Sequence, residues 1–204
     1  MRNLLYNYIV NDFTDHSYKS CLEYFPFDSN ILDIGIGNGK MLKTFHPLIR
    51  SKQLSITGVD INKVYLKNCK RLIKKYHLQD HLTIYHEPIE YFSPPNNEYY
   101  DFVLFSMSFM LFNNQPLILD KVKNYLNPNG EIVFFQTMFK NKSWLLDFTK
   151  PKLKYITTID FGKATYENEF FTLLEKHKLS VSQDKVIPKK FGKGEHRMIV
   201  AKQN

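Results

Sequence analysis

The sequence has few cysteines and no long apolar run. Its 204 residues include two cysteines, Cys21 and Cys69, which stand apart without C-x-x-C spacing. Isolated thiols are typical of a reducing compartment and predict neither a disulfide framework nor a cysteine-based metal site. The longest apolar stretch, Phe102 to Phe112, is shorter than the roughly 18–20 residues of a membrane-spanning helix. We therefore expect a cytoplasmic protein without a membrane span.

Two further patterns are missing. The N-terminal apolar run is broken by Asn7 and soon meets acids, which does not fit a signal peptide. The seven histidines and the acids have no spacing typical of metal ligands, so no bound metal is expected. With 43% hydrophobic residues and no low-complexity linker, the chain is expected to fold as one domain over residues 1–204.

Arginine is scarce, although the chain is basic. Only four of the 28 basic residues are Arg, and the formal net charge is +8. Hydrogen bonding to nucleic-acid bases favours Arg. The abundance of Lys together with Asn, Ile, Tyr and Phe indicates a compositional bias. A predicted helix over 62–76 carries a run of cations, which is either a solvated face or a docking face for RNA or an acidic substrate. These cations are Lys67, Lys70, Arg71, Lys74 and Lys75. The solvated face is preferred, so a nucleic-acid partner is possible but not favoured.

What the sequence does contain is a strand, a glycine-rich turn and a helix in succession over 31–49. Ile31, Leu32 and Ile34 suit a buried parallel strand. Glycines at 35, 37 and 39 allow a tight turn and close approach to a ligand. A helix is predicted from near Asn38, with apolar residues at helical spacing. This arrangement predicts a ligand site at the turn.

The glycine spacing distinguishes two ligand classes. Dinucleotide-binding domains use G-x-G-x-x-G, but the position five residues after Gly35 is Lys40, and the third glycine falls early at Gly39. The stretch 55–62 predicts a second strand with an acid at its C-terminal tip, Asp60, which lies 25 residues after Gly35. Ligands of open α/β sheets bind at the carboxyl ends of the strands, where such a carboxylate can accept ribose hydroxyls.

The spacing G-x-G-x-G after Asp33, with Asp60 on the next strand, resembles the class I S-adenosylmethionine-dependent methyltransferases. The aromatic-Asp entry to a strand over 99–106, the passage Asn127-Pro128-Asn129-Gly130 before a strand over 131–136, and a closing pair of strands over 180–188 and 195–201 strengthen the resemblance. It covers about residues 30–202. It implies an α/β fold, Rossmann-like, with a seven-stranded, mostly parallel sheet, helices on both faces and a C-terminal antiparallel hairpin.

The resemblance also implies a cofactor, S-adenosyl-L-methionine, and the residues that would hold it. The methionine end would lie against Asp33, Gly35, Ile36, Gly37 and Asn38. The ribose would meet Asp60, and the base would lie against Ile61. The adenine edge would meet Glu87, Pro88 and Ile89, with Glu90 as second choice to Glu87. The sulfonium would be lined by Phe105 and Ser106.

No catalytic base can be assigned from the sequence. The exit of the fourth strand, residues 106–112, has no carboxylate, Cys or Lys. Methyl transfer from a sulfonium mainly needs alignment and exclusion of water, and a base only when the acceptor arrives protonated with a high pKa. His86, at a strand end, is more simply structural.

Three segments outside the sheet complete the expectations. Residues 1–29 are aromatic-rich and are expected either to cap the cofactor or to pack on the sheet edge. Residues 138–163 form an insertion that is predicted to cover the substrate site as a roof. Thr165 is predicted to cap a helix that runs to 178. The preferred function is methyl transfer to a small molecule. The alternatives are an RNA or protein methyltransferase, a non-catalytic cofactor-binding module, and an NAD-type oxidoreductase.

Overall fold

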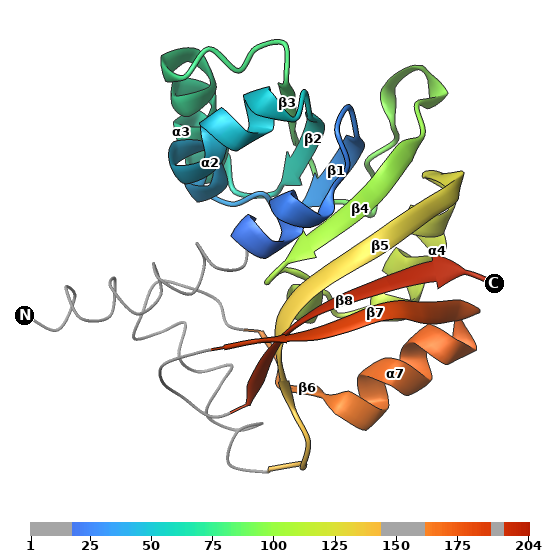
Figure 1. Cartoon of the computed structure of the whole chain (residues 1–204). Helices are drawn as coiled ribbons and strands as arrows, with labels where there is room; N and C mark the ends of the chain where they lie inside the picture. The colour runs from blue at the N-terminus through green and yellow to red at the C-terminus, as the bar shows by residue number, and fades with distance from the viewer. Residues whose placement is uncertain (1–17, 144–161, 189–193) are drawn as a thin grey trace, which may run out of the picture.

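The sheet of the computed structural model runs in the order β3-β2-β1-β4-β5-β8-β7 (Figure 1). The structure describes residues 18–143, 162–188 and 194–204. The parallel strands are β1 Asn30–Ile34, β2 Ser55–Asp60, β3 Leu82–His86, β4 Tyr100–Ser106 and β5 Leu126–Phe139. The antiparallel pair is β7 Leu179–Ile187 and β8 Glu195–Gln203. A two-residue strand, β6 Thr165–Tyr166, pairs with the end of β5.

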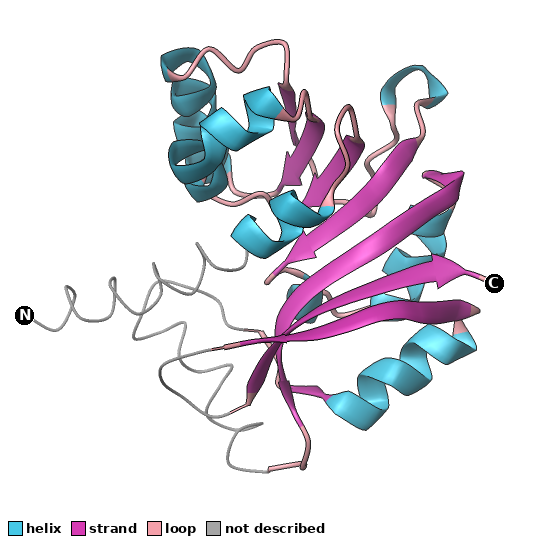
Figure 2. Ribbon diagram, viewed as in Figure 1, coloured by secondary structure: helices cyan, strands magenta, loops and turns pink. Residues whose placement is uncertain are grey.

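Helices cover both faces of the sheet (Figure 2). A helix that ends at Tyr24 lies on one face with α2 Lys40–Ser51 and α3 Lys63–Lys75, and the three share one apolar cluster. On the other face lie α4 Gln115–Lys123 and α7 Glu167–Lys176. Two short 3₁₀ turns, η1 Pro95–Asn97 and η2 Phe109–Leu111, flank β4. The predicted fold class is confirmed.

Two apolar clusters explain why the inner strands are buried on both sides. Along β1 the side chains alternate, so Ile31 packs with the cluster of α2 and α3, and Leu32 packs with the cluster of α4 and α7. The same alternation holds on β4 for Phe102 and Val103. This pattern is why the strands read as continuous apolar runs in the sequence.

Two local predictions were wrong. The passage 127–130 was expected to come before a strand over 131–136, but it lies inside β5, which already pairs with Tyr100 through Leu126. The register then shifts, and Glu131 pairs with Phe102, because the intervening residues leave the ladder as an irregularity. Thr165 does not cap α7, since it lies in β6 and Tyr166 takes the N-cap position.

The domain boundaries stay a prediction. Of the N-terminal segment 1–29, residues 18–29 are described, and their buried side chains include Tyr18, Leu22 and Phe25. Of the predicted roof over 138–163, residues 144–161 lie outside the described part of the chain.

Candidate cofactor site

The glycine turn lies at the carboxyl end of β1, where the strand order reverses between β1 and β4. Gly35, Gly37 and Gly39 have φ values of 81°, 67° and 77°, in the left-handed region. A Cβ on Gly35 would lie 2.6 Å from Cβ of Ser108, so that position admits only glycine. Within the described part of the chain, a Cβ on Gly37 would meet only the Gly35 carbonyl oxygen, at 3.9 Å. The backbone at Gly37 therefore borders open space.

Asp60 ties this turn to the next helix. Its carboxylate accepts one hydrogen bond from the backbone N–H of Gly37, at 2.8 Å, and another from the N–H of Asn62, at 2.7 Å. Asn62 in turn caps α3 through its own side chain. The half-buried carboxylate is thus held at the tip of β2, beside the turn, as the sequence pattern predicted.

Asp33 is the most unusual group at the site. It is fully buried, and neither oxygen of its carboxyl has a hydrogen-bond partner among the described residues. Burial, and then the nearby charge of Asp60, raise its pKa to about 8. An unpaired buried carboxyl is costly, and a cationic ligand group would relieve that cost.

Tyr18 lies close to Asp33 and Ser106 and was not singled out from the sequence. It is buried, and its side chain is hydrogen-bonded to that of Ser106. Burial, followed by the charge of Asp33, raises the pKa of Tyr18 well above its usual value. The sequence placed Tyr18 only in an aromatic-rich segment. It could not indicate the contact with Ser106, because the two residues are far apart in the chain.

The helix that carries Tyr18 is fastened at its C-terminal end by a lysine. Nζ of Lys52, just after α2, donates hydrogen bonds to the carbonyl oxygens of Leu22, Glu23 and Phe25, at 2.9, 2.9 and 2.5 Å. A cation is favourable at a helix C-terminus, where carbonyls lack partners within the helix.

The remaining predicted residues fall into two groups. Exposed or half-buried residues border the same edge: Asn38, Ile61, Glu87 and Pro88. Ile61 is 70% exposed, so its side chain is free to lie against a ligand. The others are buried in the apolar clusters: Ile36, Ile89 and Phe105. Phe105 stacks on Phe134 on the face opposite to Ser106, so only its backbone lies near the turn.

Neither cysteine nor histidine offers a reactive group here. The Cys69 thiol donates to the carbonyl of Gly37 at 3.2 Å, and burial raises its pKa to about 12. Nε2 of His86 lies 3.0 Å from the carbonyl oxygen of Ile61, which fits a structural role. Among the described residues, no group of three or more His, Cys, Asp or Glu could hold a metal ion.

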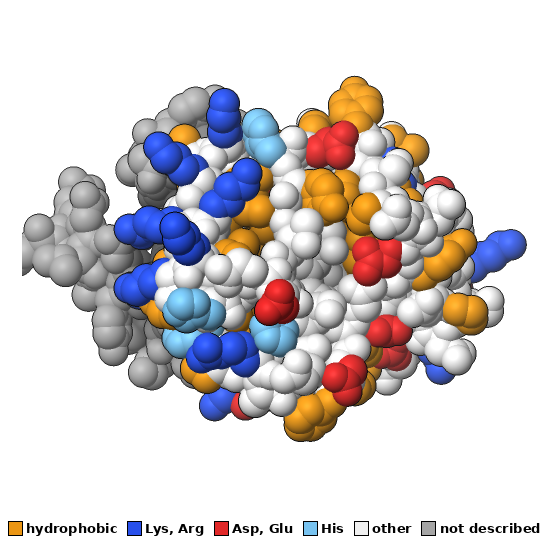
Figure 3. Space-filling view, turned by 90° about the horizontal axis from the view of Figure 1, so that it is seen from above, with side chains coloured by type: hydrophobic (Ala, Val, Ile, Leu, Met, Phe, Trp, Pro, Cys, Tyr) orange, Lys and Arg blue, Asp and Glu red, His pale blue; other side chains and the backbone are white. Residues whose placement is uncertain are grey.

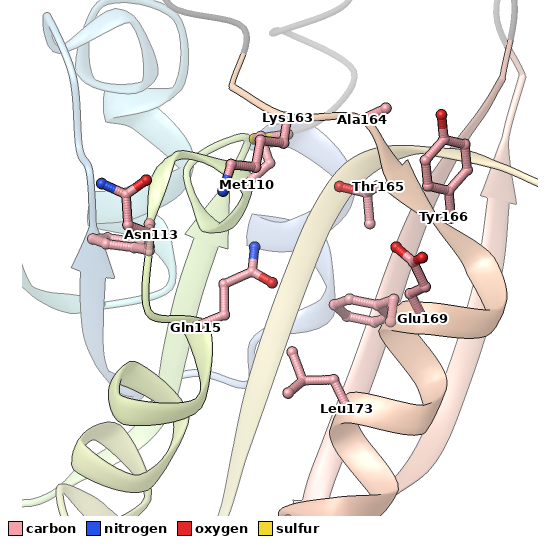
Figure 4. A pocket seen from close by; sticks show the side chains of 11 residues that line it. Met110, Asn113, Gln115, Lys163, Ala164, Thr165, Tyr166, Glu169 and Leu173 are labelled. Carbon is pink, nitrogen blue, oxygen red and sulfur yellow. The ribbon is translucent and has the colours of Figure 1, made fainter. Parts of the chain in front are cut away.

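A pocket of about 160 Å³ lies on the other side of the β4 exit (Figure 4). It opens between the segment that leads into α4 and the start of α7. Ser108, which donates to the Ile34 carbonyl at 2.5 Å, connects the glycine turn to the pocket through the next two residues. The lining is mixed: Met110, Phe112, Asn113, Gln115, Lys163, Ala164, Thr165, Tyr166, Glu169, Phe170 and Leu173.

The chemistry of these groups fits S-adenosylmethionine. The buried carboxyl of Asp33 lacks the positive partner that a methionine ammonium and sulfonium supply. The open space at Gly37 leaves room for a ligand against the backbone. Asp60 lies at the carboxyl end of β2, which is the position suited to bind a ribose.

Comparison with known proteins agrees with this geometry. A family model described as a methyltransferase domain matches residues 31–130. Des-methyl DIF-1 methyltransferase A of Dictyostelium discoideum is 23% identical over 191 residues, which cover 91% of this chain and 52% of that protein. The chain therefore spans about half the length of this curated relative.

Solved structures share the fold. The mitomycin 7-O-methyltransferase MmcR has a TM-score of 0.69 at 17% identity, covering 94% of this chain and 54% of its own. The MccD protein has a TM-score of 0.73 at 10% identity, covering 93% of this chain and 96% of its own. With the domain match, this fold makes the chain similar to S-adenosylmethionine-dependent methyltransferases, the class that its sequence motifs resemble.

Proposed function

We propose that this protein transfers a methyl group from S-adenosylmethionine to a small molecule. The observation that carries the proposal is Asp33, a fully buried carboxyl beside the glycine turn that has no hydrogen-bond partner among the residues that the structure describes. Buried carboxyls are normally hydrogen-bonded, and a cationic cofactor would supply the partner that Asp33 lacks.

The binding roles follow the positions of the side chains. Asp33 would neutralise the positive charge of the methionine end, while the backbone at Gly35, Ile36, Gly37 and Asn38 would border it. Asp60 would accept the ribose hydroxyls, exchanging its bond to Gly37 for them. Adenine would lie on the exposed Ile61 and meet Glu87, Pro88 and Ile89. Phe105 and Ser106 would line the sulfonium.

Bound S-adenosylmethionine would supply an activated methyl group for in-line displacement. The protein would then hold the acceptor in line and exclude water. The tip of β4 is suited to this task, because Ser106 and Ser108 are its polar buried residues and Phe109 and Met110 follow. No general base is assigned, so the reaction relies on alignment and on the acceptor's own ionisation.

The pocket beyond β4 supports a small acceptor. Apolar side chains such as Phe112 and Phe170 offer a surface for a hydrophobic body, and the Gln115 and Thr165 side chains offer hydrogen bonds at its rim (Figure 4). Two of the similar proteins are named for small-molecule methylation, MmcR for a 7-O position.

The predicted cytoplasmic location remains part of this proposal. Among the described residues, no helix has the length and apolar character of a membrane span.

Methyl-label transfer tests the proposal. The protein is incubated with methyl-labelled S-adenosylmethionine and an extract of its source, which is then separated into RNA, protein and small molecules. Label in the small-molecule fraction is expected. Label in RNA or protein instead would overturn the small-molecule assignment. Cofactor binding without any label would favour a non-catalytic binding module.

A further inference from the structure

Charge is distributed very unevenly along this chain. Residues 40–75 hold ten of the 28 Lys and Arg residues but only one of the 20 acids, Asp60. This segment therefore carries a net charge of +9, and the rest of the chain carries −1. A compositional bias toward Lys would spread cations over the whole chain, so it does not explain why acids are missing here.

The fold places this charge on one side of the molecule. α2 and α3 lie on the same face of the sheet and contain no acid. Seen from above, Lys and Arg side chains gather on the side of these two helices (Figure 3). All six cations of α3 are exposed, namely Lys63, Lys67, Lys70, Arg71, Lys74 and Lys75. We call them, with exposed Lys43 and Arg50 of α2, the basic face.

The basic face is not neutralised within the described part of the chain. None of the salt bridges between described residues includes a cation of α3. Lys52 differs, since its ammonium is already used by three carbonyls. Adjacent like charges three or four residues apart disfavour the helix slightly, so a bound anion would relieve repulsion along α3.

The chemistry of the face favours one class of partner. Protein interfaces are depleted of Lys and centred on apolar and aromatic residues, yet the outer side of α3 offers one exposed apolar side chain, Val64. Helices that lie in a membrane surface need a broad apolar face as well, and that of α3 is turned into the core. Phosphate backbones need only exposed cations, and Lys serves as well as Arg for contacts that read no sequence.

We propose that the basic face binds RNA through its phosphate backbone, without sequence preference. This goes beyond the proposed methyl transfer and does not depend on it. The face begins at Lys63, three residues after Asp60, and runs along α3 away from the cofactor edge. RNA binding therefore gives the enzyme a docking site separate from the pocket beyond β4.

The test measures binding of a labelled oligouridine of about 20 nucleotides by fluorescence anisotropy over a range of salt. The variant is K67Q/K70Q/K74Q, which removes three lysines on one side of α3. The control is K176Q/K185Q/K202Q, which removes three exposed lysines elsewhere and leaves the same net charge. Thermal unfolding checks that both variants fold.

Wild-type protein is expected to bind with a strong salt dependence. The slope of log affinity against log salt should fall by about 2 in K67Q/K70Q/K74Q, because each phosphate of a single strand that a lysine neutralises contributes about 0.7 to that slope. The control should keep the wild-type slope. Equal weakening in both variants would overturn the proposal, because net charge alone would then explain binding.

Two other probes separate the partner classes. Vesicles containing phosphatidylserine and a polyglutamate peptide are titrated under the same conditions. If either probe bound as tightly as RNA, the choice of RNA would be overturned in favour of a lipid or acidic-protein partner. The absence of RNA binding at low salt would also overturn the proposal. S-adenosylhomocysteine binding by K67Q/K70Q/K74Q is expected to be unchanged, so failure here is distinguishable from failure of the proposed function.

Discussion

At the scale of single residues, Asp33 is expected to make stability depend on pH. Its pKa is about 8 in the folded protein, above the ordinary 3.8, so the folded state keeps a proton that the unfolded chain releases between these values. The free energy of unfolding therefore falls as the pH rises from the unfolded-state pKa to the folded-state pKa. We expect the stability of Asp33→Asn relative to wild type to rise by several kcal/mol, at most about 5, between pH 4 and pH 8.

Urea unfolding at pH 4, 6 and 8 measures this gain. Asp80→Asn, in the exposed loop after α3, is the matched control and should show no such trend. A constant difference between Asp33→Asn and wild type across the three pH values would contradict the raised pKa.

The glycine turn provides a second residue-scale prediction, because two of its glycines differ in surroundings. Gly35→Ala forces a methyl group against Ser108 at positive φ, so we expect a loss of about 2–4 kcal/mol of stability. Gly37→Ala meets open space and should cost only about 1–2 kcal/mol through its positive φ. Its methyl group would occupy the space proposed for the cofactor.

Denaturant unfolding and calorimetric titration with S-adenosylhomocysteine separate the two effects. The affinity of Gly37→Ala for S-adenosylhomocysteine should fall, and the fall should exceed what the smaller fraction of folded protein accounts for. If the folded Gly37→Ala protein bound the ligand like wild type, the turn would not be the binding surface.

At the scale of elements, Arg197 of β8 joins the hairpin to α7. Its guanidinium pairs with Asp184 on β7 and, at 3.0 Å, with Glu167 on α7, and it lies 5.3 Å from the ring centroid of Phe171. Hydrogen bonds from Arg197 to Asp184 and Glu167 raise its pKa further, against the cost of burial. Arg197→Met would leave both carboxylates unpaired.

We expect this substitution to cost about 2–3 kcal/mol, below the range for fully buried pairs because the carboxylates are partly exposed. Arg197→Lys keeps the charge but loses the planar, two-pronged guanidinium. The stability of this variant should lie between those of Arg197→Met and wild type. Thermal and urea unfolding are the measurements. A change under about 0.5 kcal/mol for Arg197→Met would mean that the ion pairs do not hold the hairpin.

The elements also show what the sequence could reveal. The strand, turn and helix at 30–51 were predictable because their signal is local: alternation, glycine spacing and an apolar helix face. The irregular start of β5 was not, since Asn127 to Gly130 favour a turn and only pairing with β4 keeps them in the strand. Asp33 and Asp60 were found by motif spacing. Tyr18 and the pocket lining depend on contacts between distant segments, which no local pattern encodes.

At the scale of the whole molecule, cofactor binding should stabilise the fold. A ligand that binds only the folded state adds about 2.7 kcal/mol at one hundred times its Kd. For a chain of this size that corresponds to a rise in Tm of about 5–10 °C, which differential scanning fluorimetry with S-adenosylhomocysteine measures. NADH at the same concentration should give no rise.

Asp60→Ala should reduce the calorimetric affinity for S-adenosylhomocysteine by about 1–3 kcal/mol. The apo Tm of this variant must be measured separately, because Asp60 also holds Gly37 and Asn62. Unchanged affinity would remove the ribose assignment.

The fastening of the N-terminal helix by Lys52 has a kinetic consequence. Asp33 is sealed from solvent, and Tyr18 bonds to Ser106 one to two turns before the end that Lys52 pins. We therefore expect a ligand to reach Asp33 only after the helix that carries Tyr18 has moved outward, while the Lys52 hydrogen bonds hold the C-terminal end of that helix. In stopped-flow mixing, the observed association rate should level off at high ligand concentration, at the frequency with which the helix opens.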